Sequence, residues 1–333
     1  MRPRLVFVHG IGGPRRTDRE LAEWTRSLAS GMAAAGHSGQ ARRLEDGDVE
    51  GPVFAYYGDL FHRPQAQGGA AGPVPAGEEE EAAVLGELLL ELTDALLADN
   101  RERASDDEEW RSRHKVLEHA RAEAAPNGQE QGALSVARRA LNVATTLLSL
   151  PPWRGAAQWM LPKLMVRDLA QVARYLARAE PDEAGATLDR RIRQRLAEAI
   201  GQGPTVVVAH SLGTVVALET LHESSTVPVP LFVTLGSPLS LRAVVQPRTV
   251  PRPTATPESV VSWLNFWDRD DLISVRPLLE RDVRPNRFGV VPVSSRVDSD
   301  GIWVHSATKY LAHPAVAGPI AEALARAASG ERG

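Results

Sequence analysis

Ser211 is the residue in this chain best placed to act as a nucleophile. It follows the apolar run 206–209, and the small residues Ala209 and Gly213 flank it at the −2 and +2 positions. A serine on a sharp strand-to-helix turn needs small neighbours there, because the two backbones nearly touch and the turn exposes the hydroxyl above the sheet. The spacing therefore predicts a nucleophile elbow. The alternative is a serine that only caps a helix.

The segments around Ser211 have the pattern that such a turn requires. Residues 205–209 are β-branched and apolar, and the glycines and proline of 201–204 precede them, which is typical of a buried parallel strand. Apolar residues at helical spacing then predict a helix over 212–221. Strand, turn and helix thus follow one another in the required order.

A glycine-rich segment could supply the groups that stabilise a negatively charged oxygen. A strand is predicted at 4–8, and His-Gly-Ile-Gly-Gly at 9–13 follows it. In the elbow arrangement one oxyanion donor comes from the residue after the nucleophile and the other from a loop after an earlier strand. We expect these donors to be the backbone N–H groups of Leu212 and Ile11. A dinucleotide fingerprint is excluded because its third glycine would fall at Arg15.

A nucleophilic serine needs a base, and the base needs a carboxylate that orients it. The expected order is serine, acid, histidine, each after a strand. Strands are predicted at 231–235 and 260–267, and three aspartates follow the second one. We assign the acid to Asp271, because the Asp-x-Ile-Ser run that it begins resembles the acid loop of lipases and esterases. Asp268 is the alternative, and it could equally be a turn residue that caps its own backbone.

Two histidines, His305 and His313, lie beyond the three aspartates. A last strand is predicted at 290–297, and His305 follows it after a short turn, so His305 is the predicted base. His313 stands at the start of a helix predicted over 315–328, where a surface or capping role fits better. His210, next to the nucleophile, is expected to point away from the elbow and to be structural.

These motifs resemble those of serine hydrolases of the α/β-hydrolase superfamily. Within it they are most similar to bacterial lipase-like proteins related to the GPI inositol-deacylase and DUF676 serine esterase groups. The resemblance covers roughly the first 60 residues and everything after about 165, and it is more specific for fold than for substrate. The segments that carry it are LVFVHGIG at 5–12, VVVAHSLG at 206–213, TLGSPL at 234–239, WLNFWDRDD at 263–271 and His305.

The resemblance implies an α/β fold with a doubly wound, mostly parallel sheet of about six strands, covered by helices on both faces. Its strand order would run 53–57, 4–8, 205–209, 231–235, 260–267 and 290–297 across the sheet. Two departures stand out. Ala209 replaces the more usual glycine, and the chain begins at the strand that carries the oxyanion loop, so the two antiparallel strands that open many members would be absent.

Length and pattern predict one catalytic domain, formed by 1–60 and 168–333, and a helical insertion at 61–167 that acts as a cap or lid. The stretch 134–165 is apolar, yet two adjacent arginines inside it argue against a membrane span. We expect a lid helix that lines an acyl pocket with Trp153, Trp159, Met160 and Met165. A membrane-surface helix is one alternative, and a helical subdomain packed on its own core is another.

The composition of the chain limits which partners, which kinds of site and which location are expected. The 333 residues include 38 Lys and Arg against 42 Asp and Glu, a net charge of −4, which does not suggest nucleic acid. The chain has no cysteine, so a thiolate site is excluded. No apolar leader precedes the strand at 4–8, and a cytoplasmic location is expected.

The expected activity is hydrolysis of a carboxylic ester, from a small-molecule or lipid-like acyl substrate, by a Ser211–His305–Asp271 triad without a metal or organic cofactor. Thioesterase, amidase or acyltransferase chemistry would use the same triad. A noncatalytic scaffold that keeps the fold is the alternative from another class.

Overall fold

The computed structural model separates into two units. It describes residues 4–10, 16–47, 50–62, 77–125, 133–150, 161–224, 226–274, 278–299 and 304–329. The sheet unit comprises Met1–His62 and Arg190–Gly333, and the helical unit comprises Arg63–Asp189. The helical unit is thus inserted in the sequence of the sheet unit.

The described residues of the sheet unit form six strands that all run parallel, in the order β2-β1-β3-β4-β5-β6. Their number and order are those expected from the sequence, so the prediction of a doubly wound α/β fold is confirmed. The strands are β1 (Arg4–Val8), β2 (Glu50–Ala55), β3 (Thr205–His210), β4 (Leu231–Leu235), β5 (Trp263–Asp268) and β6 (Pro292–Val297).

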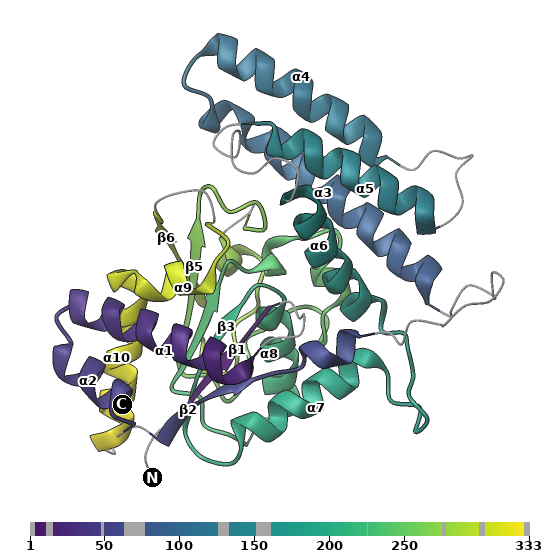
Figure 1. Ribbon diagram of the computed structural model, residues 1–333. Helices are drawn as coiled ribbons and strands as arrows, with labels where there is room; N and C mark the ends of the chain where they lie inside the picture. The colour runs from purple at the N-terminus through teal and green to yellow at the C-terminus, as the bar shows by residue number, and fades with distance from the viewer. Residues whose placement is uncertain are drawn as a thin grey trace. The chain divides into compact units, whose positions relative to one another are not determined.

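Helices cover both faces of this sheet (Figure 1). One face packs against α1 (Thr17–Ala34), α2 (Ser38–Glu45), α9 (Ala307–Ala312) and α10 (Pro314–Ser329), and their side chains form one apolar core with the strands. The other face carries α7 (Leu188–Ile200) and α8 (Leu212–Glu223). All six residues of β3 are buried, and residues 206–209 in the middle of this strand form an unbroken apolar run.

The order of the strands places a natural site at the carboxyl ends of β1 and β3. From β1 the chain continues to β2 on one side of β1. It later returns to β3 on the other side of β1 and continues from there to β4. Doubly wound sheets bind ligands outside the carboxyl ends of the strands at such a reversal. Short 3-10 helices lie in the connecting segments, at Gly58–Phe61, Pro238–Ser240, Gln246–Arg248 and Leu279–Arg281.

Four helices make up the described part of the helical unit: α3 (Glu78–Arg103), α4 (Asp107–Ala124), α5 (Ala133–Leu148) and α6 (Leu161–Ala177). The start of α4 is capped by Asp106, whose side chain accepts hydrogen bonds from the N–H groups of Glu108 and Glu109. The expected domain boundary at 167/168 lies within α6. That helix packs against α3 and α5, so its amphipathic face completes the core of the helical unit.

The stretch expected to form a lid is described in part. Residues 151–160, with Trp153, Trp159 and Met160, lie outside the described residues. Helix α5 buries Val143, Ala144 and Leu147, and it packs against α3, α4 and α6 of its own unit. This packing favours a helical subdomain with its own core, and the acyl-pocket lid and the membrane-surface helix stay predictions. In the part of the chain that is described, no helix is long and apolar enough to cross a bilayer.

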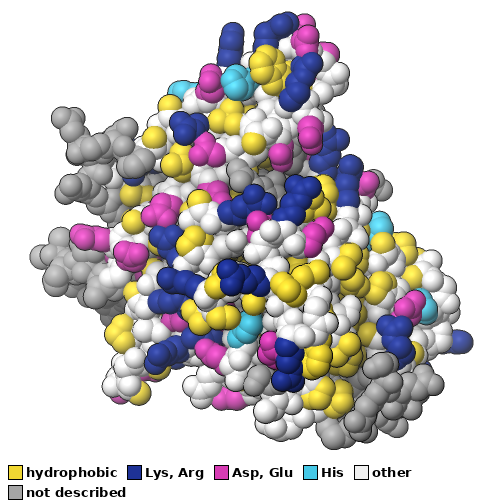
Figure 2. All heavy atoms as spheres, turned by 180° about the vertical axis from the view of Figure 1, so that it is seen from behind, with side chains coloured by type: hydrophobic (Ala, Val, Ile, Leu, Met, Phe, Trp, Pro, Cys, Tyr) yellow, Lys and Arg dark blue, Asp and Glu magenta, His cyan; other side chains and the backbone are white. Residues whose placement is uncertain are grey.

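Charged side chains of both signs are interspersed on the surface. Figure 2 shows Lys and Arg beside Asp and Glu on the face seen from behind. Ion pairs join several of them in the sheet unit, among them Arg195–Asp59, Arg242–Asp282 and Arg287–Glu258.

Candidate active site

Ser211 stands on a strained turn between β3 and α8. Its backbone has φ 53° and ψ −130°, a positive φ that residues with a side chain rarely adopt and that is found at functional sites. The turn is held on both sides: the Ser211 N–H donates to the Leu235 carbonyl at 3.0 Å, and the Thr214 N–H donates to the Ser211 carbonyl at 2.9 Å. Strand, sharp turn and helix follow one another as the sequence predicts.

Two glycines let the backbone close around Ser211. A Cβ on Gly213 would lie 2.7 Å from the Val8 carbonyl oxygen and closer still to that of His9, so α8 can approach the end of β1 only without a side chain there. A Cβ on Gly10 would lie 2.5 Å from the Cβ of Ser211. The small residue at +2 is therefore required, and the segment after β1 lies against the serine.

A row of hydrogen bonds joins Ser211, His305 and Asp271. His305 Nε2 lies 2.9 Å from Ser211 Oγ, and His305 Nδ1 lies 2.8 Å from Asp271 Oδ2. A carboxylate can only accept, so Nδ1 carries a proton, and in the neutral form of the ring Nε2 is the acceptor that faces the serine hydroxyl. Both distances lie within the range expected for a nucleophile, its base and the orienting acid. The structure brings these three predicted residues together.

Asp268, the alternative acid, makes other contacts. Its Oδ2 accepts hydrogen bonds from the N–H and the hydroxyl of Ser299 at 2.6 and 2.5 Å, and its Oδ1 accepts from the Asp270 N–H at 2.9 Å. These bonds tie the turn after β5 to the end of β6. Asp268 therefore has the role of a turn aspartate, which the sequence offered as its other interpretation.

The acid of the row is fully buried and ionised. Burial by itself raises the pKa of Asp271. The attraction of the His305 ring when it is protonated, together with the hydrogen bonds from His305, the Ile273 N–H and the Tyr310 hydroxyl, holds this pKa below its usual range. The Ile273 N–H donates to Oδ1 at 2.9 Å, and the Tyr310 hydroxyl donates to Oδ2 at 2.8 Å. Sequence reasoning did not identify Tyr310, because no motif marks this residue and the short helix α9 that carries it was not predicted.

One of the two predicted oxyanion donors is described. Leu212 is the first residue of α8, and the N–H groups of a first helical turn have no partner within the helix and lie at its positive end. Ile11 lies outside the described residues. The start of its loop is held by Tyr57, whose hydroxyl donates to the His9 carbonyl and lies 3.1 Å from that of Gly10. The Tyr57 N–H donates to His9 Nε2 at 3.2 Å, and the two rings stack.

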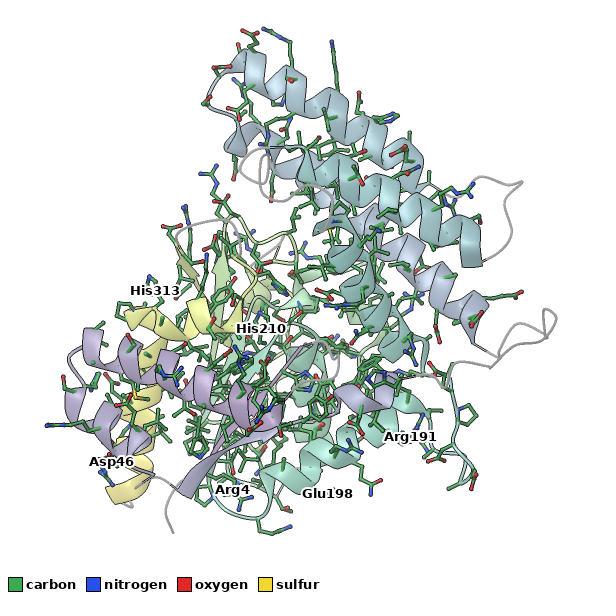
Figure 3. The ribbon with its side chains drawn as sticks, in the orientation of Figure 1. Arg4, Asp46, Arg191, Glu198, His210 and His313 are labelled. Atoms are coloured by element: carbon green, nitrogen blue, oxygen red, sulfur yellow. The ribbon has the colours of Figure 1, made fainter. Side chains whose placement is uncertain are left out.

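The structure corrects the expectation for His210 and agrees with that for His313. The His210 ring does not point away from the site, because its centroid lies 4.6 Å from that of His305. Figure 3 shows His210 among the packed side chains at the end of β3, and His313 where α9 meets α10. The Ala315 N–H donates to His313 Nδ1 at 3.2 Å, which is a capping contact at the start of α10.

Gly236, at the end of β4, is a second residue of the site that sequence reasoning passed over. Its φ is +54°, and a Cβ there would lie 2.7 Å from Asp271 Oδ2 and 3.1 Å from His305 Nδ1. The glycine thus leaves the space that the aspartate–histidine pair occupies. A Gly-Ser-Pro run after a predicted strand was the available signal, but it does not say what packs against the glycine.

Among the described residues, no group of three or more His, Cys, Asp or Glu side chains is placed to hold a metal ion. A scan against protein-family models, a search of curated proteins and a search of solved structures each give no significant match. Function is therefore inferred from the geometry of the site alone.

Proposed function

We propose that this protein is a serine hydrolase that cleaves carboxylic esters through an acyl-enzyme. The observation that carries the proposal is the hydrogen-bonded row from Ser211 Oγ through His305 to the buried Asp271, with the serine on a positive-φ turn. Structural serines seldom combine a strained backbone with a histidine that is itself oriented by a carboxylate. The parallel strand order agrees with membership of the α/β-hydrolase superfamily, which we also propose.

The geometry supports a two-step acyl transfer. His305 Nε2 takes the proton of the Ser211 hydroxyl as Oγ attacks the ester carbonyl carbon, and the carbonyl oxygen becomes an oxyanion facing the Leu212 N–H. Collapse of this intermediate breaks the ester bond, and the leaving alkoxide receives the proton from His305. Water then attacks the acyl-enzyme by the same route and regenerates Ser211. Asp271 keeps the proton on Nδ1 and offsets the charge of the imidazolium.

Two measurements test the proposal directly. Purified protein should hydrolyse p-nitrophenyl acetate or butyrate, and a fluorophosphonate probe should label Ser211. Ser211→Ala and His305→Ala should each lower turnover by roughly 10⁴-fold, because members of such a triad act as a unit. Ser295→Ala, which changes an exposed serine on β6, is the matched control and should keep both labelling and turnover.

The outcomes separate the proposed reaction from its alternatives. Labelling of Ser211 without ester turnover would favour thioester, amide or acyl-transfer chemistry on the same triad. Wild-type protein that neither labels nor turns over any of these substrates would be a noncatalytic scaffold. If Ser211→Ala kept more than a tenth of wild-type turnover, the assignment of the nucleophile would be wrong.

A further inference from the structure

Tyr310 makes one hydrogen bond to the acid of the proposed triad and another to the backbone of Asp268. The residue is fully buried on α9, five positions after His305. Its hydroxyl donates to Asp271 Oδ2 at 2.8 Å, the same oxygen that accepts from His305 Nδ1. It also accepts a hydrogen bond from the Asp268 N–H at 3.0 Å, at the end of β5.

These two contacts fix the direction of the hydroxyl proton. A backbone N–H can only donate, so the Tyr310 oxygen is the acceptor toward Asp268, and its single proton goes to Asp271. Burial, followed by the charge of Asp271, raises the pKa of Tyr310 well above its usual value. The phenol therefore stays protonated and remains a donor throughout the pH range in which the enzyme would work.

We propose that Tyr310 is a positioning residue that orients the Asp271 carboxylate and limits its basicity toward His305. The proposal rests on the proposed hydrolase function. Three donors surround the carboxylate: Tyr310 and His305 share Oδ2, while the Ile273 N–H binds Oδ1. With these in place the carboxylate cannot rotate, and part of its charge is drawn toward the phenol.

Loss of the Tyr310 hydroxyl has two consequences that can be told apart. The carboxylate becomes free to turn, which disturbs the alignment of His305 with Ser211 and lowers kcat. Without the phenol, the negative charge of the Asp271 carboxylate is no longer partly drawn away from His305. The carboxylate then stabilises the protonated imidazole more strongly, and His305 gains its proton at higher pH. Among the described residues, the titratable ring of His210 lies beside that of His305, and Asp268 lies beyond Tyr310. Tyr310→Phe keeps both of these side chains, and it leaves the Asp268 N–H without the Tyr310 acceptor.

Tyr310→Phe removes the hydroxyl and keeps the buried ring. We expect kcat/KM for p-nitrophenyl acetate to fall roughly tenfold, with most of the loss in kcat. The acid limb of the kcat/KM profile should move to higher pH. Thr249→Val is the matched control, because it deletes another buried hydroxyl of the sheet unit, one that donates to the Gln246 carbonyl at 2.8 Å. That variant should leave the pH profile unchanged.

A readout independent of activity separates this proposal from the proposed function. NMR titration of the ring Cε1–H of His305 should show its pKa raised in Tyr310→Phe and unchanged in Thr249→Val. The chain has four tyrosines, so replacing all of them with 3-fluorotyrosine is practical. This more acidic phenol is a stronger donor and should lower the His305 pKa in wild type, but not in Tyr310→Phe. If Tyr310→Phe failed to fold, the fluorotyrosine shift in wild type alone would decide.

Each outcome then has one meaning. His305 titrations that coincide in wild type, Tyr310→Phe and the fluorotyrosine protein would overturn the proposal. A loss of rate with an unmoved titration would also overturn it, because it would reduce Tyr310 to a packing residue. Shifted titrations in a protein that hydrolyses no ester would support the coupling and refute the proposed hydrolase function.

Discussion

Replacing Gly236 with alanine would insert a methyl group beside the aspartate–histidine pair. The added Cβ would lie 2.7 Å from Asp271 Oδ2 and 3.1 Å from His305 Nδ1. Comfortable contacts of carbon with other heavy atoms are about 3.5–4.0 Å, so one or both side chains must move by about 1 Å. A misplacement of about 1 Å can cost roughly 10²-fold in rate. We therefore expect kcat/KM for an ester to fall roughly 10- to 100-fold.

The same substitution also strains the backbone. Gly236 has φ +54°, and a residue with a Cβ loses about 1–2 kcal/mol in this conformation. Stability and activity must therefore be measured together, by urea unfolding and by steady-state hydrolysis at a temperature where the variant is fully folded. The rate constant should fall while the folded fraction stays constant.

Gly289→Ala is the matched control for backbone strain. Gly289 has φ +78°, and a Cβ there would meet no atom within 4 Å. It should therefore show a similar loss of stability, about 1–2 kcal/mol, with wild-type turnover. Wild-type turnover in Gly236→Ala would refute the reasoning, and an equal loss of turnover in Gly289→Ala would trace the effect to stability.

Asp271→Asn should lower kcat by roughly 10⁴-fold, because an amide cannot hold the required tautomer of His305, whereas Asp268→Asn, which loses only turn contacts, should lower it less than tenfold. Equal losses in the two variants, measured with the same ester, would reverse the assignment of the acid. Asp271 should also contribute to stability in a pH-dependent way, since its pKa is lowered in the folded protein. That contribution is fully present above the unfolded-state pKa of about 3.9 and is lost as the pH falls through the lower folded-state pKa. The difference in urea unfolding free energy between wild type and Asp271→Asn should therefore shrink as the pH falls below about 4. A difference that persisted unchanged to pH 2 would contradict this.

The residues that the sequence placed well are those with a local signature. Ser211 has small neighbours and a strand–helix context on either side, and both are required by the backbone approach seen at Gly213. Asp271 and His305 follow strands whose order along the chain is restricted by the fold. Position along the chain limits the acid to three aspartates and the base to two histidines. The resemblance of the Asp-x-Ile-Ser run to an acid loop then selects Asp271, and the helix predicted after His313 leaves His305 as the base.

The residues that the sequence missed act through partners far away in the chain. Tyr310 and Gly236 matter because of what packs against them, and an apolar periodicity or a turn motif does not name that partner. Successive side chains of a strand point to opposite faces of the sheet, so His210 was expected to point away from Ser211. This rule does not predict that the His210 ring packs beside that of His305. Helix α6 is amphipathic, and an apolar face predicts burial without saying which core it completes.

The position of the helical unit in the chain has a consequence for synthesis on the ribosome. Strand β2 ends at Ala55, and β3, which pairs with the other edge of β1, begins only at Thr205. Ribosomes synthesise ~5–20 residues per second, so this edge of β1 stays without its neighbour for on the order of 10–30 s. The intervening helices make local contacts and can fold within this interval, whereas an apolar edge strand left without its partner invites aggregation. Slow codons or chaperone binding between these two points should therefore affect the yield of soluble protein more than the same events after Glu223, once β3 and α8 are complete.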